Sequence, residues 1–329
     1  MLKVAVIGAG RIGTVHAAAV AANPATELAL VADPFGEGAR RLATTYGARA
    51  TLDIEDVWAD DGVDAVIIGS PTPLHVEHIL AADRAGKKIL CEKPVDLDMA
   101  RVQECVLALG DRAEQVMIGF NRRFDPGFAE IQARAAAGEI GAIEQLTIIS
   151  RDPAAPPASY VAQSGGIFRD MTIHDFDMAR FLLGDIVEVS AVGQHLDAEI
   201  KAAGDFDAAV VTLTAASGAV ATIINNRHCA SGYDQRLEVS GATGMLEAGN
   251  HRGTLVRYSG ASYTEAAGPY LNFFLERYTA AYAAELAAFV AAAEADAPVT
   301  PNVLDGRAAL ALADAATRSA RTGERVRIG

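Results

Sequence analysis

The feature that most constrains this fold is a glycine-rich turn between an apolar strand and a helix at the start of the chain. The apolar run Val4–Ile7 leads directly into Gly8-Ala-Gly10-Arg11-Ile12-Gly13, which fits the pattern G-x-G-x-x-G. In a strand–turn–helix context, the first glycine permits the tight turn, the second lets the backbone approach a pyrophosphate, and the third lets the helix pack on the strand. The helix N-terminus then offers amide groups to the anion. These residues (Gly8, Gly10, Arg11, Ile12 and Gly13) are therefore predicted to bind a dinucleotide.

An acidic residue extends the predicted cofactor site. Asp33 ends the second apolar run, twenty residues beyond Gly13. A carboxylate at this position accepts hydrogen bonds from the adenosine ribose and repels a 2′-phosphate, so NAD is predicted over NADP. Arg40 and Arg41, which follow in the next helix, are interpreted as solvated surface residues.

The first 120 residues alternate short strands with helices. Their apolar runs do not alternate with polar residues, which is typical of parallel strands buried on both faces. The strands are expected at 4–7, 28–32, 65–69, 88–91 and 116–120, and the helices at 12–23, 36–46, 74–85 and 98–109. This βαβ series predicts an α/β fold in which residues 1–120 form a Rossmann domain with a doubly wound parallel sheet.

Residues 121–329 have a different rhythm and are predicted to form a second, α+β domain. Successive strands lack intervening helices, so neighbouring pairs should be antiparallel and form a large open sheet. The expected strands are 143–150, 186–193, 208–214, 219–227, 235–241, 244–248 and 254–259, and the expected helices are 126–137, 170–183, 273–295 and 304–319. The pattern leaves open whether the last helix packs on the first domain.

Charge and cysteine content exclude several classes of protein. The net charge of −14 argues against nucleic acid as a partner, because phosphate backbones are held by clustered lysines and arginines. No run of 18 apolar residues occurs, so no membrane span is expected, and the short apolar start is interpreted as a strand rather than a signal peptide. Three widely spaced cysteines form neither a disulfide framework nor a zinc site. A reducing cytoplasm is the expected location.

A lysine stands where ligands bind in open α/β sheets. Cys91-Glu92-Lys93-Pro94 follows a predicted parallel strand, at the carboxyl edge of the sheet. Lys93 could hydrogen-bond a substrate hydroxyl there, although a lysine taken alone is more often a surface residue. The sequence leaves the cis or trans state of Pro94 open.

A second polar cluster lies on a largely apolar helix. Asp170, His174 and Asp177 are spaced i, i+4 and i+7, so they share one helical face. A buried histidine with a carboxylate one turn away suits a general base, because the acid stabilises the imidazolium. A histidine that only braces the helix is an equal alternative.

Together these motifs resemble the glucose–fructose oxidoreductase / inositol dehydrogenase / MocA family over nearly the whole chain, and segments 120–125 and 232–236 resemble its bacterial inositol 2-dehydrogenase branch. The resemblance implies NAD-dependent oxidation of a cyclic polyol, with myo-inositol going to 2-keto-inositol. It also implies a homotetramer. The implied catalytic residues are Lys93, Asp170 and His174, the substrate contacts are Arg122, Asp152 and Tyr233, and further cofactor contacts are Thr72, His75, Glu92 and Lys93.

In the implied mechanism, His174 takes the hydroxyl proton while the hydride passes to the nicotinamide; Lys93 hydrogen-bonds the oxygen and Asp170 orients His174. Two alternatives remain: an aldose or sugar-acid dehydrogenase of the same family, and a non-catalytic NAD-sensing regulator. No metal site is expected, since His75 and His78 lack a third ligand.

Overall fold

A six-stranded parallel sheet organises the N-terminal part of the chain in the computed structural model, which describes residues 1–329 except for the side chain of Ala162. Its strand order is β3-β2-β1-β4-β5-β6, which confirms the predicted doubly wound topology, with the winding reversing between β1 and β4. The strands are β1 Leu2–Ile7, β2 Thr26–Ala32, β3 Arg49–Thr51, β4 Ala65–Ile68, β5 Lys88–Glu92 and β6 Val116–Gly119.

Helices flank this sheet and bury its central strands. They are α1 Arg11–Ala22, α2 Glu37–Tyr46, α3 Glu55–Ala59, α4 His75–Arg84, α5 Met99–Leu109 and α12 Thr279–Ala295, with short 3-10 turns η1 Thr72–Leu74, η2 Gly110–Gln115 and η3 Asn121–Phe124. All four side chains of β4 are fully buried, which explains its unbroken apolar sequence. The sequence did not predict β3 and α3, which are only three and five residues long.

The chain divides into two units that are not continuous in sequence. The first comprises Met1–Phe124 and Ala280–Leu310, and the second comprises Asp125–Thr279 and Ala311–Gly329. The chain therefore enters the second unit four residues beyond the predicted boundary at 120 and returns to the first unit for most of α12 and the start of α13 (Val303–Thr322).

The second unit contains a seven-stranded sheet of order β12-β11-β7-β10-β9-β8-β15. Its strands are β7 Ile143–Arg151, β8 Ile186–Gln194, β9 Ala208–Ala215, β10 Val220–Asn226, β11 Asp234–Gly241, β12 Gly244–Ala248 and β15 Val326–Arg327. Consecutive strands β8–β9, β9–β10 and β11–β12 are antiparallel, as predicted. Strands β7 and β10, which are far apart in sequence, pair in parallel.

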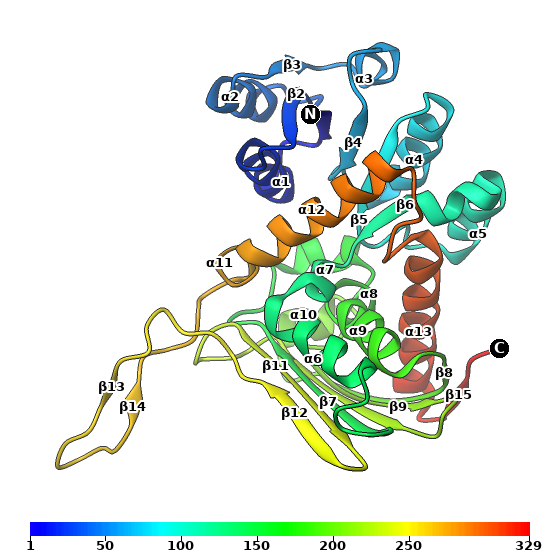
Figure 1. Ribbon diagram of the computed structural model, residues 1–329. Coiled ribbons are helices and arrows are strands. Elements are labelled where there is room, and N and C mark those ends of the chain that lie inside the picture. Colours follow the sequence, from blue (N-terminus) through cyan, green and yellow to red (C-terminus); the bar gives the residue numbers. More distant parts are fainter. The chain divides into compact units, whose positions relative to one another are not determined.

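One face of this sheet is covered by helices, and the other is open (Figure 1). Along β9, Val211 and Leu213 are fully buried, whereas Val210, whose side chain points to the opposite face, is 47% exposed. This alternation is typical of a strand with one buried face. The helices of this unit are α6 Pro126–Ala136, α7 Ala158–Ser164, α8 Ile167–Asp170, α9 Ile173–Leu183, α10 Ala198–Ala202, α11 Phe274–Arg277 and the later turns of α13. Among the described residues, no helix is both long enough and apolar enough to cross a membrane.

Three predicted elements need correction. The single helix predicted over 170–183 is two helices, α8 and α9, because the Thr172 amide bonds back to the Ile167 carbonyl, five residues earlier, and interrupts the α-helical ladder. The helix predicted over 273–295 is broken at Tyr278, whose side chain is buried. The strand predicted over 254–259 is reduced to β13 Arg257–Tyr258, which pairs with β14 Ala266–Ala267 in an exposed hairpin (Figure 1).

Candidate functional site

The glycine-rich turn has the sterics expected of a dinucleotide loop. Gly8 has φ +92°, and a Cβ at this position would lie 2.5 Å from the Gly69 carbonyl oxygen. At Gly13, a Cβ would lie 1.9 Å from the Gly8 carbonyl oxygen, so only glycine allows α1 to start this close to the turn. A Cβ on Gly10 would meet nothing within 4 Å, which leaves open space above the N-terminus of α1. No side chain caps that terminus, so its amides suit a phosphate.

Asp33 lies directly against this loop. Its Oδ2 accepts a hydrogen bond from the Ala9 amide at 2.7 Å, and its Oδ1 accepts one from the Phe35 amide at 2.9 Å. The half-buried carboxylate is therefore held at the end of β2 beside the turn. Negative charge at this point repels the 2′-phosphate of NADP and so favours NAD, the cofactor predicted from the sequence. Arg40 and Arg41 are exposed on α2.

His75 joins two loops at the carboxyl edge of the parallel sheet. Its Nδ1 lies 2.8 Å from the Pro94 carbonyl oxygen, and its Nε2 lies 2.8 Å from the Ser70 carbonyl oxygen. Burial lowers the pKa of His75. The hydrogen bonds to the two carbonyl oxygens oppose this effect, but burial is the larger cause. Thr72, in η1, is half-buried. That these two residues line the cofactor groove remains a prediction.

Lys93 follows the last residue of β5, at the sheet edge where the sequence predicted it. The Lys93–Pro94 peptide bond is cis, and the lysine side chain is half-buried. Glu92 points into the protein: it is 7% exposed, and its Oε1 lies 2.7 Å from Nε2 of His16 on α1. Thus Glu92 connects the strand that carries the lysine to the helix of the dinucleotide motif.

A carboxyl group that the sequence did not single out lies near this pair. Glu285, on α12, is fully buried, and neither of its carboxyl oxygens has a hydrogen-bond partner among the described residues. Burial raises the pKa of Glu285 well above its ordinary value, and the charge of Glu92 raises it further. Its position in an alanine-rich helix is the only signal that the sequence offered. Arg122, in η3, is also buried.

The second unit holds Asp170 and His174 on consecutive helices. Asp170 is the last residue of α8, and His174 lies in the first turn of α9 and is half-buried. The Asp170 carboxylate accepts hydrogen bonds from the Tyr160 hydroxyl at 2.9 Å and from Arg227 at 3.2 Å. Neither partner could be predicted from the motif, because Tyr160 lies 10 residues before Asp170 and Arg227 lies 57 residues after it. Asp177 is buried in α9.

The two substrate residues predicted in this unit, Asp152 and Tyr233, lie at one end of its sheet, as does Arg227, which was not predicted. Asp152 directly follows β7, Tyr233 directly precedes β11, and Arg227 directly follows β10. Arg151 pairs with Asp234 across one ladder and with Asn226 across the other, so these three strand ends are level. The Tyr233 ring is buried edge-on against Tyr278, with centroids 6.0 Å apart.

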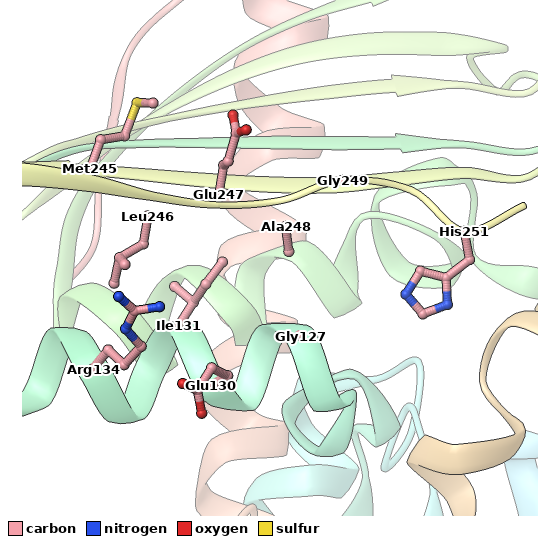
Figure 2. A pocket seen from close by; sticks show the side chains of 10 residues that line it. All are labelled: Gly127, Glu130, Ile131, Arg134, Met245, Leu246, Glu247, Ala248, Gly249 and His251. Atoms are coloured by element: carbon pink, nitrogen blue, oxygen red, sulfur yellow. The ribbon is translucent and has the colours of Figure 1, made fainter. Parts of the chain in front are cut away.

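A hollow of about 470 Å³ lies elsewhere in the second unit, between α6 and β12. Figure 2 shows Ile131 and Arg134 of α6 facing Leu246 and Ala248 of β12, whereas Met245 and Glu247 point to the other side of the strand; His251 lies at one end. None of the predicted catalytic or substrate residues lines it, so it is separate from the candidate site.

The predicted catalytic residues thus fall in both units, Lys93 in the first and Asp170 and His174 in the second; so do the predicted substrate residues, Arg122 in the first and Asp152 and Tyr233 in the second. Lys93, Arg122, Asp152 and Tyr233 adjoin the ends of strands, whereas Asp170 and His174 lie on helices α8 and α9. That they act together remains a prediction.

Comparisons with known proteins show the family of the chain. Residues 2–120 match the profile of an oxidoreductase family with an NAD-binding Rossmann fold, and residues 128–247 match the GFO/IDH/MocA C-terminal domain. The chain is 49% identical to an inositol 2-dehydrogenase of Rhizobium meliloti over 97% of this chain and 96% of the relative.

Solved structures are similarly close. A myo-inositol dehydrogenase from Corynebacterium glutamicum matches with a TM-score of 0.98 and 54% identity, over 100% of this chain and 99% of that one. A scyllo-inositol dehydrogenase from Lactobacillus casei, solved with NAD(H) and scyllo-inositol, matches with a TM-score of 0.91 and 28% identity, over 99% of each chain.

Proposed function

Because this chain belongs to the GFO/IDH/MocA family of NAD-binding oxidoreductases, we propose that it oxidises myo-inositol at its 2-hydroxyl to 2-keto-inositol. The observation that carries the substrate class is the similarity to inositol 2-dehydrogenases across the full length of both chains. This similarity includes the second unit, where the polyol contacts are expected, and not only the dinucleotide domain.

The residues of the first unit fit the cofactor. The open space over Gly10, the uncapped start of α1 and the carboxylate of Asp33 suit a pyrophosphate and an unphosphorylated ribose. Held there, NAD would supply the hydride acceptor for the oxidation of the carbinol carbon. Lys93 provides an ammonium group at the carboxyl edge of the sheet, where it donates a hydrogen bond to the reacting oxygen and stabilises negative charge on it.

The residues of the second unit supply the proton chemistry. His174 accepts the proton of the substrate hydroxyl while the C–O bond of the substrate becomes a carbonyl, so the imidazole gains one positive charge. The carboxylate of Asp170, held by Tyr160 and Arg227, supplies a compensating negative charge close in sequence to His174. Arg122, Asp152 and Tyr233 hydrogen-bond the remaining hydroxyls and set the orientation of the ring. Such orientation is a large part of the rate advantage of an enzyme.

A substrate panel tests this proposal directly. The purified chain is incubated with NAD and each of the inositol isomers, together with common aldoses and sugar acids, and cofactor reduction is followed by absorbance. Turnover of myo-inositol above the other isomers supports the proposal. No turnover of any inositol would refute it, and preference for an aldose would favour the alternative enzyme of the same family.

Substitution of the proposed base gives a second test. His174→Ala should lower kcat on the order of 10²–10⁴-fold, because a general base contributes that much. His251→Ala is the matched control, since this histidine is exposed and lies outside the proposed site. Activity of His174→Ala near that of the control would remove His174 from the mechanism.

We also propose a homotetramer that acts in cytoplasmic inositol catabolism. The open face of the seven-stranded sheet exposes β-branched and sulfur side chains, among them Val192 (67% exposed), Val210 and Met245. A sheet face of this kind suits a second copy of the chain. Light scattering of the purified chain tests the tetramer, which Val210→Glu should dissociate. The buried thiols of Cys91, Cys105 and Cys229, none of them in a disulfide, suit a reducing compartment.

A further inference from the structure

A fully buried arginine connects two carboxylates of the second unit. Arg227 follows β10, and its side chain is 1% exposed. One guanidinium nitrogen, Nη1, donates to Oδ2 of Asp205 at 3.0 Å, and the other, Nη2, donates to Oδ2 of Asp170 at 3.2 Å. Arginine stays charged at any working pH, so its burial would be costly without such partners.

Asp205 is fixed from its other side. Its Oδ1 accepts a hydrogen bond from the Ile167 amide at 3.0 Å, at the start of α8. A Cβ on Gly166 would lie 2.7 Å from this same oxygen, so the carboxylate fits closely against the backbone. Both ends of α8 are thus joined to one guanidinium: the first amide through Asp205, and the last side chain, Asp170, directly.

Asp170 is the most exposed of the three groups. Its side chain is 20% exposed, compared with 9% for Asp205 and 1% for Arg227. Its second oxygen accepts the Tyr160 hydroxyl, so each carboxylate oxygen has its own donor and the plane of the group is set. Two carboxylates thus share the one guanidinium of Arg227.

We propose that Arg227, held by Asp205, is a positioning residue that fixes the orientation of the Asp170 carboxylate relative to α9 and His174. This inference rests on the proposed roles of Asp170 and His174. The chemistry needs an aspartate that stays in one place as His174 gains its proton, and a planar guanidinium between two carboxylates provides that. A lysine ammonium does not replace it, because its single nitrogen lacks the two fixed donor positions by which Nη1 and Nη2 reach Asp205 and Asp170.

A double-mutant cycle on kcat tests the proposal. Arg227→Met and Asp170→Asn are measured singly and together, with the preferred polyol and NAD. Arg227→Met should lower kcat by up to about 10²-fold, the scale of a misplaced catalytic group, with a smaller change in the KM for the polyol. If Arg227 acts through Asp170, the double variant should be no slower than Asp170→Asn alone.

Two further variants separate positioning from folding. Asp205→Asn keeps both Arg227 and Asp170 but presents a neutral amide to the guanidinium. This variant should lower kcat, as Arg227→Met does. Arg169→Gln is the matched control, because Arg169 lies on α8 and pairs with Asp314 at 2.6 Å, and its kcat should stay near that of the parent. Fluorescence of bound NADH checks that each variant retains its cofactor site.

The outcomes distinguish this inference from the proposed function. Arg227 would only support the fold if the double variant lost as much kcat as the two single variants together. An Arg169→Gln variant as slow as Arg227→Met would show the same. An Asp170→Asn variant with parental kcat would instead refute the proposed role of Asp170 itself.

Discussion

The buried carboxyl of Glu285 should make the first unit less stable as the pH rises. This side chain has no exposed surface, and its pKa is raised well above the ordinary value of 4.5 by burial and by Glu92. Above pH 4.5 the unfolded chain has lost this proton, while the folded protein retains it up to the raised pKa. The folded state then binds more protons than the unfolded state, so its free energy of unfolding falls as the pH rises.

The magnitude follows from this difference of one proton. Each pH unit in which only the folded state keeps the proton lowers the free energy of unfolding by about 1.4 kcal/mol. Glu285→Gln removes the titrating group and keeps its shape. The variant should resemble the parent near pH 5 and become progressively more stable than the parent as the pH rises, by about 1.4 kcal/mol for each pH unit over which only the folded parent keeps the proton.

Urea unfolding at pH 5, 6, 7 and 8 measures this difference. The fluorescence of Trp58, the single tryptophan of the chain, reports on the same unit as Glu285. His16 and Glu92 are unchanged in the variant, so the difference between the two proteins reports on Glu285 alone. Glu294→Gln is the matched control, because Glu294 is exposed on the same helix. A constant difference between variant and parent from pH 5 to pH 8 would show that Glu285 is ionised in the folded protein.

Three other changes follow from the contacts described above. Gly13→Ala should abolish NADH binding in a fluorescence titration, since its Cβ would meet the backbone of the preceding turn at 1.9 Å; binding near the parental affinity would contradict the sterics. Asp33→Ser should raise the ratio of NADP to NAD activity at least about tenfold, equivalent to about 1.4 kcal/mol, and an unchanged ratio would mean that the carboxylate does not select the cofactor. Asp125→Asn leaves Arg277 buried without its counter-charge and should cost about 3–5 kcal/mol in urea unfolding followed by circular dichroism; a loss below about 1 kcal/mol would refute this account.

Much of the first unit could be predicted from the sequence, because its determinants are local. The glycine turn and Asp33 lie within the first 33 residues, each apolar strand is one short continuous run, and the structure has these features in the predicted order. The short elements β3 and α3 escaped prediction, since three to five residues carry too little periodicity to identify them.

Only the tertiary structure could decide how distant residues combine. The break between α8 and α9 depends on Thr172, whose hydroxyl bonds to Asn225 of β10, a partner 53 residues away. Arg227 and Tyr160 join Asp170 because strand pairing and helix packing bring their segments together, and Glu285 becomes unusual only where α12 buries it beside Glu92. Periodicity specifies what each segment forms, whereas the partners of a buried charge are set by which segments pack against it, and that information is not local.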